Sequence, residues 1–247
     1  MPSRALQLLR KILVLARPGS LALRPGHCPG CGPTLLVKLA DDAISVRCIR
    51  CRASTIHMSI LQVLQQLYPD LSGTATYEMS SRGPLFDYLR ARAAKFTCSE
   101  FFDDVQPGAY RNGVQCQDVQ ALTYEDASFD LCTSTEVFEH VPDDYKGFRE
   151  IRRVLRSGGR FVFTVPLTES ATTIERAALQ DGAVYHMLEP EYHGDAIRGH
   201  GQVLCFRNYG KDILERLREC GFREARLVPV DRAGWWGFGT DVVVAGV

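Results

Sequence analysis

The sequence lacks any apolar run of about 18 residues, the length that a membrane-spanning helix requires, so no such helix is predicted. It also lacks compositional bias: of its 247 residues, 45% are hydrophobic and 23% are charged, which excludes disordered, collagen-like and coiled-coil proteins. A net charge is absent too, because 29 Lys and Arg residues balance 29 Asp and Glu residues. The chain as a whole therefore has no bulk attraction to nucleic acid or to acidic membranes.

The charge is nevertheless unevenly distributed along the chain. Residues 1–60 contain nine basic and two acidic residues, a net charge of +7, which leaves −7 for the remainder. Residues 4–17 combine basic side chains with Leu6, Leu9 and Leu13 at helical spacing. We interpret residues 1–24 as a basic amphipathic segment packed on its own protein, with an organelle presequence or a helix on a membrane surface as alternatives.

The cysteines do not form an evenly paired disulfide framework, because there are nine of them and five are scattered through apolar stretches. No small-residue cleavage site follows the first apolar stretch, so a secretory signal is not predicted. Both observations indicate a reducing compartment, most simply the cytoplasm.

Four cysteines form two Cys-x2-Cys pairs, Cys28 with Cys31 and Cys48 with Cys51, separated by 16 residues. This spacing is typical of a zinc ribbon, because each short turn directs two sulfurs at one ion. Between the pairs, apolar residues alternate from Leu35 to Val46 and predict a β-hairpin. Four thiolates leave no open coordination position, so residues 25–60 are predicted to hold a structural zinc ion.

From Thr74 onward, short β-rich runs alternate with helical ones, which predicts an α/β fold with a doubly wound parallel sheet. Helices are expected at residues 84–94, at 143–155 with a stop at Gly158 and Gly159, and at 211–220. The expected strands are residues 75–80, 95–99, 113–115, 129–134, 160–166, 225–230 and 241–245.

Residues 118–166 read DVQALTYEDASFDLCTSTEVFEHVPDDYKGFREIRRVLRSGGRFVFTVP. This string closely resembles the central part of class I S-adenosylmethionine-dependent methyltransferases of the methyltransferase-11 type, and the resemblance covers about residues 74–247. It implies a Rossmann-like, seven-stranded methyltransferase sheet, a methyltransferase domain at residues 61–247, and S-adenosylmethionine as cofactor.

Three acidic residues, Glu78, Glu100 and Asp118, follow three successive predicted strands, where ligands of open α/β sheets bind. Glu100 comes 22 residues after Glu78, near the offset of roughly 20 residues at which an acid binds a ribose. The resemblance implies that Asp118 binds the adenine amino group and that the backbone of Val119 contacts the ring. The complete predicted cofactor set is Glu78, Ser80, Gly83, Glu100, Asp118, Val119 and Ser134.

The loop after the first of these strands departs from the family pattern. It reads Glu78-Met79-Ser80-Ser81-Arg82-Gly83, with one glycine where the family usually has three. Serine is small enough for close approach of a ligand, and its hydroxyl can bind polar cofactor groups. A degenerate loop also leaves open a non-catalytic adaptor that has lost the cofactor.

The acceptor is expected to approach His140, which lies just past the fourth strand and is the candidate base, with backbone capping as the alternative role. Residues 167–209 form a long insertion, which predicts a substrate lid. Within it, His193 is a second catalytic candidate, and Tyr192 and Asp195 are substrate candidates. A weaker alternative is a second zinc site formed by His186, His193 and His200.

The leading hypothesis is a cytoplasmic O-methyltransferase that acts on a small hydroxylated acceptor, such as a sugar or glycoconjugate. The main alternative is an RNA methyltransferase whose basic zinc ribbon contacts phosphates, although the acidic catalytic half argues against it. The non-catalytic adaptor is the third.

Overall fold

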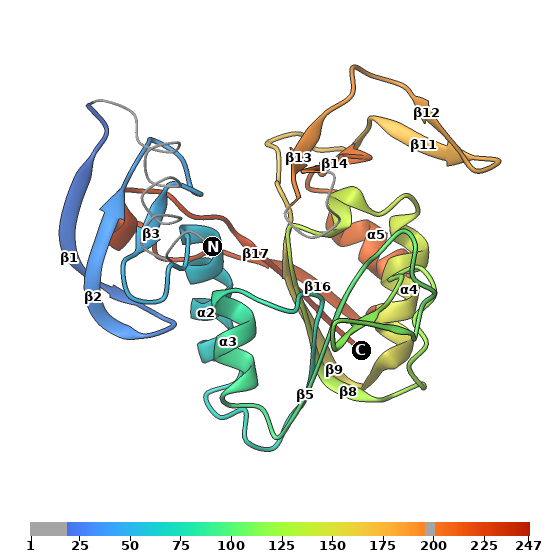
Figure 1. Ribbon diagram of the computed structural model, residues 1–247, viewed down its shortest axis with the longest axis horizontal. Coiled ribbons are helices and arrows are strands. Elements are labelled where there is room, and N and C mark those ends of the chain that lie inside the picture. The colour runs from blue at the N-terminus through green and yellow to red at the C-terminus, as the bar shows by residue number, and fades with distance from the viewer. Residues whose placement is uncertain (1–18, 196–200) are drawn as a thin grey trace.

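The computed structural model describes residues 19–195 and 201–247. Most of the predicted segment 1–24, and His200, lie outside the described residues. A central sheet carries helices on both faces, and a smaller β-module lies beside it (Figure 1). Within the described ranges, no helix is both long and apolar enough to cross a bilayer.

The central sheet has eight strands and confirms the predicted α/β class. The five inner strands from β9 to β7 are parallel, and β17 runs antiparallel between β9 and β16. All seven predicted strands are present, and the two-residue strand β6 is added at one edge. In sheet order the strands are β16 (Glu224–Val228), β17 (Val242–Gly246), β9 (Leu155–Thr164), β8 (Phe129–Thr135), β4 (Ala75–Glu78), β5 (Lys95–Glu100), β7 (Val114–Cys116) and β6 (Tyr110–Arg111).

The order of the strands creates a crevice at the centre of the sheet. The chain passes from β4 outward through β5 to β7 and then returns to β8 on the other side of β4. The connections after β4 and β8 therefore leave in opposite directions. In open α/β sheets, ligands bind outside the carboxyl ends of the strands at such a switch point.

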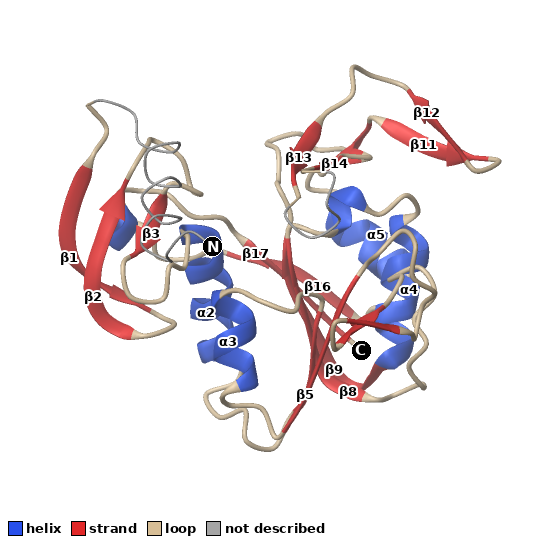
Figure 2. Ribbon diagram, in the orientation of Figure 1, coloured by secondary structure: helices blue, strands red, loops and turns tan. Residues whose placement is uncertain are grey.

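Two layers of helices cover the sheet, α2 (Thr55–Leu67) with α3 (Pro84–Arg90) on one face and α4 (Asp144–Val154) with α5 (Ile213–Glu219) on the other (Figure 2). Successive strand residues point to opposite faces, so a strand that has helices on both sides packs alternate side chains against each helix layer. In β9, Val162 packs with α2 and α3, whereas Phe161 and Phe163 pack with α4 and α5. This alternation gives the domain two cores.

The sequence predicts that Gly158 and Gly159 end a helix, but in the structure they do not. Helix α4 ends at Val154, and β9 begins at the next residue, so both glycines lie inside a strand. The pairing of β8 with β9 is irregular here; Gly158 has a φ of +79°, and a Cβ on Gly159 would lie 2.8 Å from the Arg156 carbonyl oxygen. The glycines therefore accommodate a bulge.

The N-terminal module is a three-stranded antiparallel sheet of β1 (Ala22–Cys28), β2 (Gly32–Lys38) and β3 (Val46–Cys48). The predicted hairpin is β2 with β3, and β1 is an additional strand. Leu36, opposite Cys48, is fully buried and Leu35 is exposed, so the buried face of β2 differs from the predicted one. The expected boundaries at 24/25 and 60/61 fall inside β1 and inside α2.

This module packs against the main domain through a small apolar cluster. Leu36 of β2 lies in one cluster with Met58 of α2 and with Trp235 of η2 (Ala233–Trp235). The guanidinium of Arg24 in β1 lies 4.1 Å from the ring centroid of Trp236, a cation–π contact. Helix α2 therefore packs against both the N-terminal module and the central sheet.

The insertion at 167–209 is built from short β-ribbons above the carboxyl edge of the sheet (Figure 1). Its outer parts are two antiparallel hairpins, and a third pair of strands joins its beginning to its end. The pairs are β10 (Ile174–Glu175) with β15 (Arg207–Asn208), β11 (Ala177–Gln180) with β12 (Ala183–His186), and β13 (Tyr192–Gly194) with β14 (Gln202–Leu204).

Candidate active site

A cavity of about 550 Å³ lies at the carboxyl ends of the central strands. Its walls come from β4, β5 and the loops after β7 and β8, and the insertion covers it through β11, β13 and β14. Five of the residues predicted from the sequence line it, namely Glu100, Asp118, Val119, His140 and Asp195. The structure therefore brings three of the seven cofactor candidates and two acceptor-side candidates together in one cavity.

Glu100 orders the serine loop at one end of the cavity. Its Oε1 accepts hydrogen bonds from the backbone N–H of Ser81 at 2.7 Å and from the Ser81 hydroxyl at 2.8 Å. Burial raises the pKa of Glu100, and the bonds from Ser81 oppose that rise. The Ser80 hydroxyl donates to the Arg82 carbonyl at 2.8 Å, so this serine stabilises the loop itself.

Gly83 holds the turn from this loop into α3. Its φ of +106° lies in the region that favours glycine, and it precedes Pro84 at the first position of the helix. Neither Ser80 nor Gly83 is among the residues lining the cavity. Their contribution in this structure is to the shape of the loop.

Asp118 and Val119 form the wall after β7. The Asp118 carboxylate accepts a hydrogen bond from the backbone N–H of Gln120 at 2.9 Å, which fixes the turn. The Gln120 side-chain carbonyl in turn accepts from the backbone N–H of Asp143, the residue that precedes α4, at 3.0 Å. The two residues predicted to bind adenine, Asp118 and Val119, thus lie on a loop that is hydrogen-bonded to the start of α4.

Two predicted cofactor residues, Glu78 and Ser134, lie beneath the cavity and do not line it. Glu78 is 1% exposed, accepts a hydrogen bond from the Thr133 hydroxyl, and has its pKa raised to about 8 by burial. Side chains alternate along β4, so its neighbours Tyr77 and Met79 reach the cavity and Glu78 does not. Ser134 is fully buried, and its hydroxyl has no hydrogen-bond partner among the described residues.

The acceptor end of the cavity contains two histidines that lie close together. His140 ends η1 (Phe138–His140), and its Nδ1 lies 2.8 Å from the Leu204 carbonyl oxygen. His193 comes from β13 of the insertion, and its ring is perpendicular to that of His140 with 5.0 Å between centroids. Although it does not line the cavity, His193 contacts a residue that does.

Sequence reasoning missed two carboxylates beside these histidines. Glu139 lies between them, with its Oε1 3.5 Å from His140 Nε2 and 3.6 Å from His193 Nδ1, and it raises the pKa of His193. Glu136 lines the cavity, and burial together with the charge of Glu139 raises its pKa to about 8. Both acids belong to the string TEVFEH, in which only the histidine carried an expectation of catalysis.

The other residues predicted to be functional in the insertion do not all lie at the cavity. Tyr192 is half exposed and does not line the cavity, whereas Asp195 does. His186 is exposed on the separate β11–β12 hairpin, while His193 faces His140 and Cys205. Two members of the predicted trio, His186 and His193, thus lie on different hairpins, and the third, His200, lies outside the described residues.

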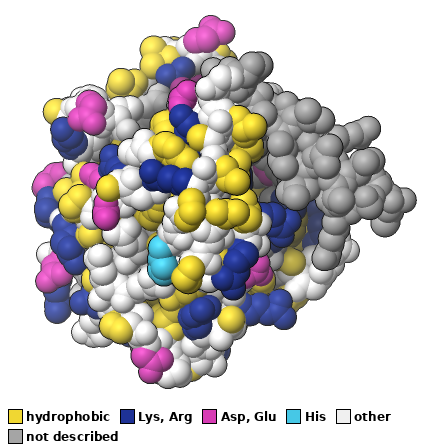
Figure 3. Space-filling view, turned by 90° about the vertical axis from the view of Figure 1, so that its left-hand side faces the viewer, with side chains coloured by type: hydrophobic (Ala, Val, Ile, Leu, Met, Phe, Trp, Pro, Cys, Tyr) yellow, Lys and Arg dark blue, Asp and Glu magenta, His cyan; other side chains and the backbone are white. Residues whose placement is uncertain are grey.

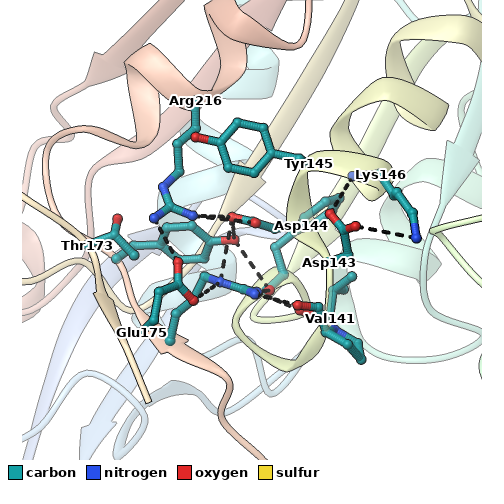
Figure 4. A network of polar contacts seen from close by, with 12 residues as sticks. Val141, Asp143, Asp144, Tyr145, Lys146, Thr173, Glu175 and Arg216 are labelled. Atoms are coloured by element: carbon teal, nitrogen blue, oxygen red, sulfur yellow. Dashed lines mark hydrogen bonds and ion pairs between the residues drawn. The ribbon is translucent and has the colours of Figure 1, made fainter. Parts of the chain in front are cut away.

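A buried polar network anchors the base of the insertion (Figure 4). Arg207 on β15 is 3% exposed and donates to the carbonyls of Phe138, Val141 and Pro142, which follow β8. It also forms an ion pair with Glu175 of β10 at 3.1 Å. Together these contacts bind both ends of the insertion to the loop that carries His140.

Asp144, at the start of α4, continues this network. Its carboxylate is nearly inaccessible, accepts from the Tyr209 hydroxyl at 2.8 Å, and pairs with Arg216 of α5 at 3.1 Å. Arg216 also contacts Glu175 at 2.7 Å. Two arginines therefore compensate the buried Asp144 and the partly exposed Glu175, which meets the requirement that buried charges be paired.

In the N-terminal module the four predicted cysteines converge. Cys28 Sγ lies 3.5 Å from Cys51 Sγ, and Cys31 Sγ lies 3.4 Å from Cys48 Sγ, with all four sulfurs within 4.8 Å of one another. None of the four is in a disulfide. This arrangement fits the tetrahedral thiolate site of a structural zinc ion.

Comparison with known proteins gives matches to methyltransferases. Residues 80–163 match a family model described as a methyltransferase domain. The chain is 52% identical over 46 residues to a sarcosine/dimethylglycine N-methyltransferase of Halorhodospira halochloris, and 36% identical over 50 residues to a ubiquinone biosynthesis O-methyltransferase of Coxiella burnetii. These matches cover 19% and 20% of this chain, and only 16% and 21% of the length of those relatives.

Among solved structures, the chain is similar to an S-adenosylmethionine-dependent methyltransferase from Mesorhizobium loti, with a TM-score of 0.45 and 15% identity over 76% of this chain and 96% of that one. The match of residues 80–163 spans strands β5 to β8 and most of β9, and it includes Glu100 and Asp118 but not Glu78. Over residues 80–163, about a third of its length, this chain is therefore similar to a methyltransferase domain.

Proposed function

We propose that this protein binds S-adenosylmethionine at the Glu100 and Asp118 end of the cavity and transfers its methyl group to a small hydroxylated acceptor held beneath the insertion. The observation that carries the proposal is the continuity of the cavity. One space of about 550 Å³ extends from Glu100 to His140, within the range of roughly 300–1,000 Å³ typical of small-molecule sites.

The polar groups of the cavity suit the two ends of this reaction. In methyl transfer, an acceptor oxygen attacks the methyl carbon, the carbon–sulfur bond breaks, and its electron pair stays on sulfur to give S-adenosylhomocysteine. The main task of the protein is to align the two reactants and exclude water. The hydroxyl proton has to leave, and Glu136, which lines this end of the cavity, can take it when ionised, that is, above its raised pKa of about 8.

The insertion supports a small acceptor over a polymer. Leu179, Val203 and Phe206 of the insertion line the cavity and contribute an apolar cover. A cover of this kind encloses a small molecule and aligns it, whereas a nucleic acid needs a continuous open path for its backbone. A sugar or glycoconjugate hydroxyl is the acceptor class that we propose.

The cysteine cluster is proposed to hold one zinc ion with a structural role. Its four sulfurs converge, and the module that carries them has only a small apolar cluster of its own. Metal binding would then supply folding energy to that module. Its packing on α2 joins this stability to the methyltransferase domain.

The RNA methyltransferase is the second candidate, based on the basic residues of the module. On the face that Figure 3 shows, however, Lys and Arg side chains are separated by hydrophobic and uncharged ones, without a continuous basic band. Arg47, one of the basic residues of the module, is partly buried, and its guanidinium donates to the Arg52 carbonyl. These observations favour the small acceptor.

Two measurements test the proposal. Calorimetry with S-adenosylhomocysteine is expected to show binding to one site, and absence of binding would establish the adaptor instead. Labelled S-adenosylmethionine is then offered with small glycoconjugate extracts or with total RNA at two salt concentrations. We expect labelling of the small molecules with little salt dependence.

A matched pair of variants decides between the two enzymes. Salt-sensitive methylation of RNA that is lost in a combined Arg47→Ala, Arg50→Ala and Arg52→Ala variant would contradict the small acceptor. The control replaces the exposed Arg223 and Arg226 of the catalytic half with alanine, and it should leave either reaction unchanged.

A further inference from the structure

Three side chains with nitrogen or sulfur donors converge at the acceptor end of the cavity from two separate parts of the chain. His140 follows β8, whereas His193 and Cys205 come from the β13–β14 hairpin and the residue after it. Their donor atoms lie within 4.8 Å of one another, as do the four cysteine sulfurs of the N-terminal module. Cys205 Sγ lies 3.8 Å from His140 Nδ1.

The tautomer of His140 is set by its surroundings. A carbonyl oxygen can only accept a hydrogen bond, so His140 Nδ1, 2.8 Å from the Leu204 carbonyl, carries the proton and donates it. This leaves Nε2, which lies 3.5 Å from Glu139 Oε1, as the coordinating nitrogen. Cys205 Sγ lies nearer to Nδ1, so the thiol side chain has to turn toward Nε2 to bind the same ion. A ring N–H bonded to a backbone carbonyl is the support that metal-binding histidines generally have.

The distances around Glu139 resemble those between the ligands of one ion. Its Oε1 lies 3.5 Å from His140 Nε2 and 3.6 Å from His193 Nδ1. Both values exceed the range of about 2.7–3.2 Å for N–H···O hydrogen bonds. Zinc bonds of about 2.0–2.3 Å in a tetrahedron place neighbouring ligand atoms about 3.3–3.8 Å apart. The spacing therefore suits three ligands around a common centre.

Glu139 provides an independent observation that points to a cation. The residue is 1% exposed, and neither of its carboxylate oxygens has a hydrogen-bond partner among the described residues. A buried carboxylate without hydrogen bonds is costly unless an ion or another charge compensates it. A divalent ion between Glu139 and the two histidines would satisfy it.

We propose that His140, His193 and Cys205, together with the buried carboxylate of Glu139, form a second metal site, which takes a divalent transition metal of the zinc type. Imidazole and thiolate donors favour zinc over magnesium or calcium, which prefer oxygen ligands. Because His140 lines the cavity, the ion would lie at its edge and bind the acceptor through an oxygen atom. This role, though not the metal site itself, rests on the proposed function.

The test counts metal ions in the full-length protein. Elemental analysis is expected to find two zinc equivalents per chain, one for the cysteine module and one for this site. Cys205→Ser and His193→Ala should each lose one of the two equivalents, and circular dichroism together with the retained first equivalent would show that the variants fold. The matched controls, Cys220→Ser and His186→Ala, should keep both equivalents.

Cobalt provides a second readout for metal that is lost during purification. Titration of the metal-depleted protein with Co²⁺ is expected to give two sets of absorption bands, one of which disappears in Cys205→Ser. Calorimetry with S-adenosylhomocysteine on the same samples tests cofactor binding separately, so the two proposals can fail independently. A single zinc equivalent, with a cobalt spectrum that Cys205→Ser does not change, would overturn the second site and leave a histidine–carboxylate ion pair.

Discussion

The buried carboxyl of Glu78 should make the stability of this protein depend on pH in a definite direction. Burial raises its pKa from an ordinary value of 4.5 to about 8, so the folded protein keeps a proton that the unfolded chain releases. Between these two values the folded state binds more protons, and the free energy of unfolding falls as pH rises. The slope reaches about 1.4 kcal/mol per pH unit, which amounts to at most about 5 kcal/mol.

The variant Glu78→Gln keeps the shape of the side chain and an acceptor for the Thr133 hydroxyl while removing the titration. Its stability should equal that of the wild-type protein near pH 4, exceed it increasingly from there up to pH 8, and stay higher by a constant amount above pH 8. Urea unfolding followed by circular dichroism at five pH values measures this difference.

The matched control is Glu169→Gln, because the Glu169 side chain is fully exposed, and this change should give no pH-dependent difference. Parallel curves for wild type and Glu78→Gln from pH 5 to pH 9 would refute the reasoning. Such a result would mean that Glu78 is ionised in the folded protein and that the burial of its carboxyl has been compensated.

Three further predictions concern the site, the module and the anchor. Glu100→Gln should weaken S-adenosylhomocysteine binding about tenfold or more in calorimetry, because a charge-assisted hydrogen bond contributes about 1.5–3 kcal/mol. The exposed control Glu125→Gln should bind with the wild-type affinity. Equal affinities of Glu100→Gln and wild type would show that the cofactor lies elsewhere. Cys48→Ser should lose one zinc equivalent and lower the thermal midpoint, and an unchanged zinc content would exclude the four-cysteine site. Asp144→Asn should lower the free energy of unfolding by about 3–5 kcal/mol in urea, since it leaves the Arg216 charge undercompensated. A decrease of less than about 1 kcal/mol in that free energy would contradict the stabilising role of the ion network.

The strands that bear the site were predictable because β4, β5, β8 and β9 are short runs rich in β-branched and aromatic residues that alternate with helical stretches. The first strand, β1, was not, because Pro25 and Gly26 disfavour a strand, and it depends on long-range pairing with β2. The bulge at Gly158 could not be predicted for the same reason. Two adjacent glycines usually indicate the end of a helix, yet here their conformation depends on pairing with a neighbouring strand.

The acids at the strand ends were predictable by position, and Glu100 and Asp118 do line the cavity. Glu78 was placed at the correct end of its strand, but a strand exposes alternate side chains, and the sequence did not indicate which face meets the ligand. The convergence of His140 with His193 spans 53 residues and depends on how the insertion folds back. Local spacing carries no information on such a contact.

The anchoring of the insertion by Arg207 has a consequence for turnover. Arg207 is bonded to three carbonyls and to Glu175, so the joint that would let the whole insertion swing away from the sheet is locked. In the proposed reaction, release of the demethylated cofactor would then proceed through smaller movements of the outer hairpins, β11–β12 and β13–β14. Since β13 carries His193, each such opening would also take apart the acceptor end of the cavity, which couples product escape to disassembly of the reactive geometry.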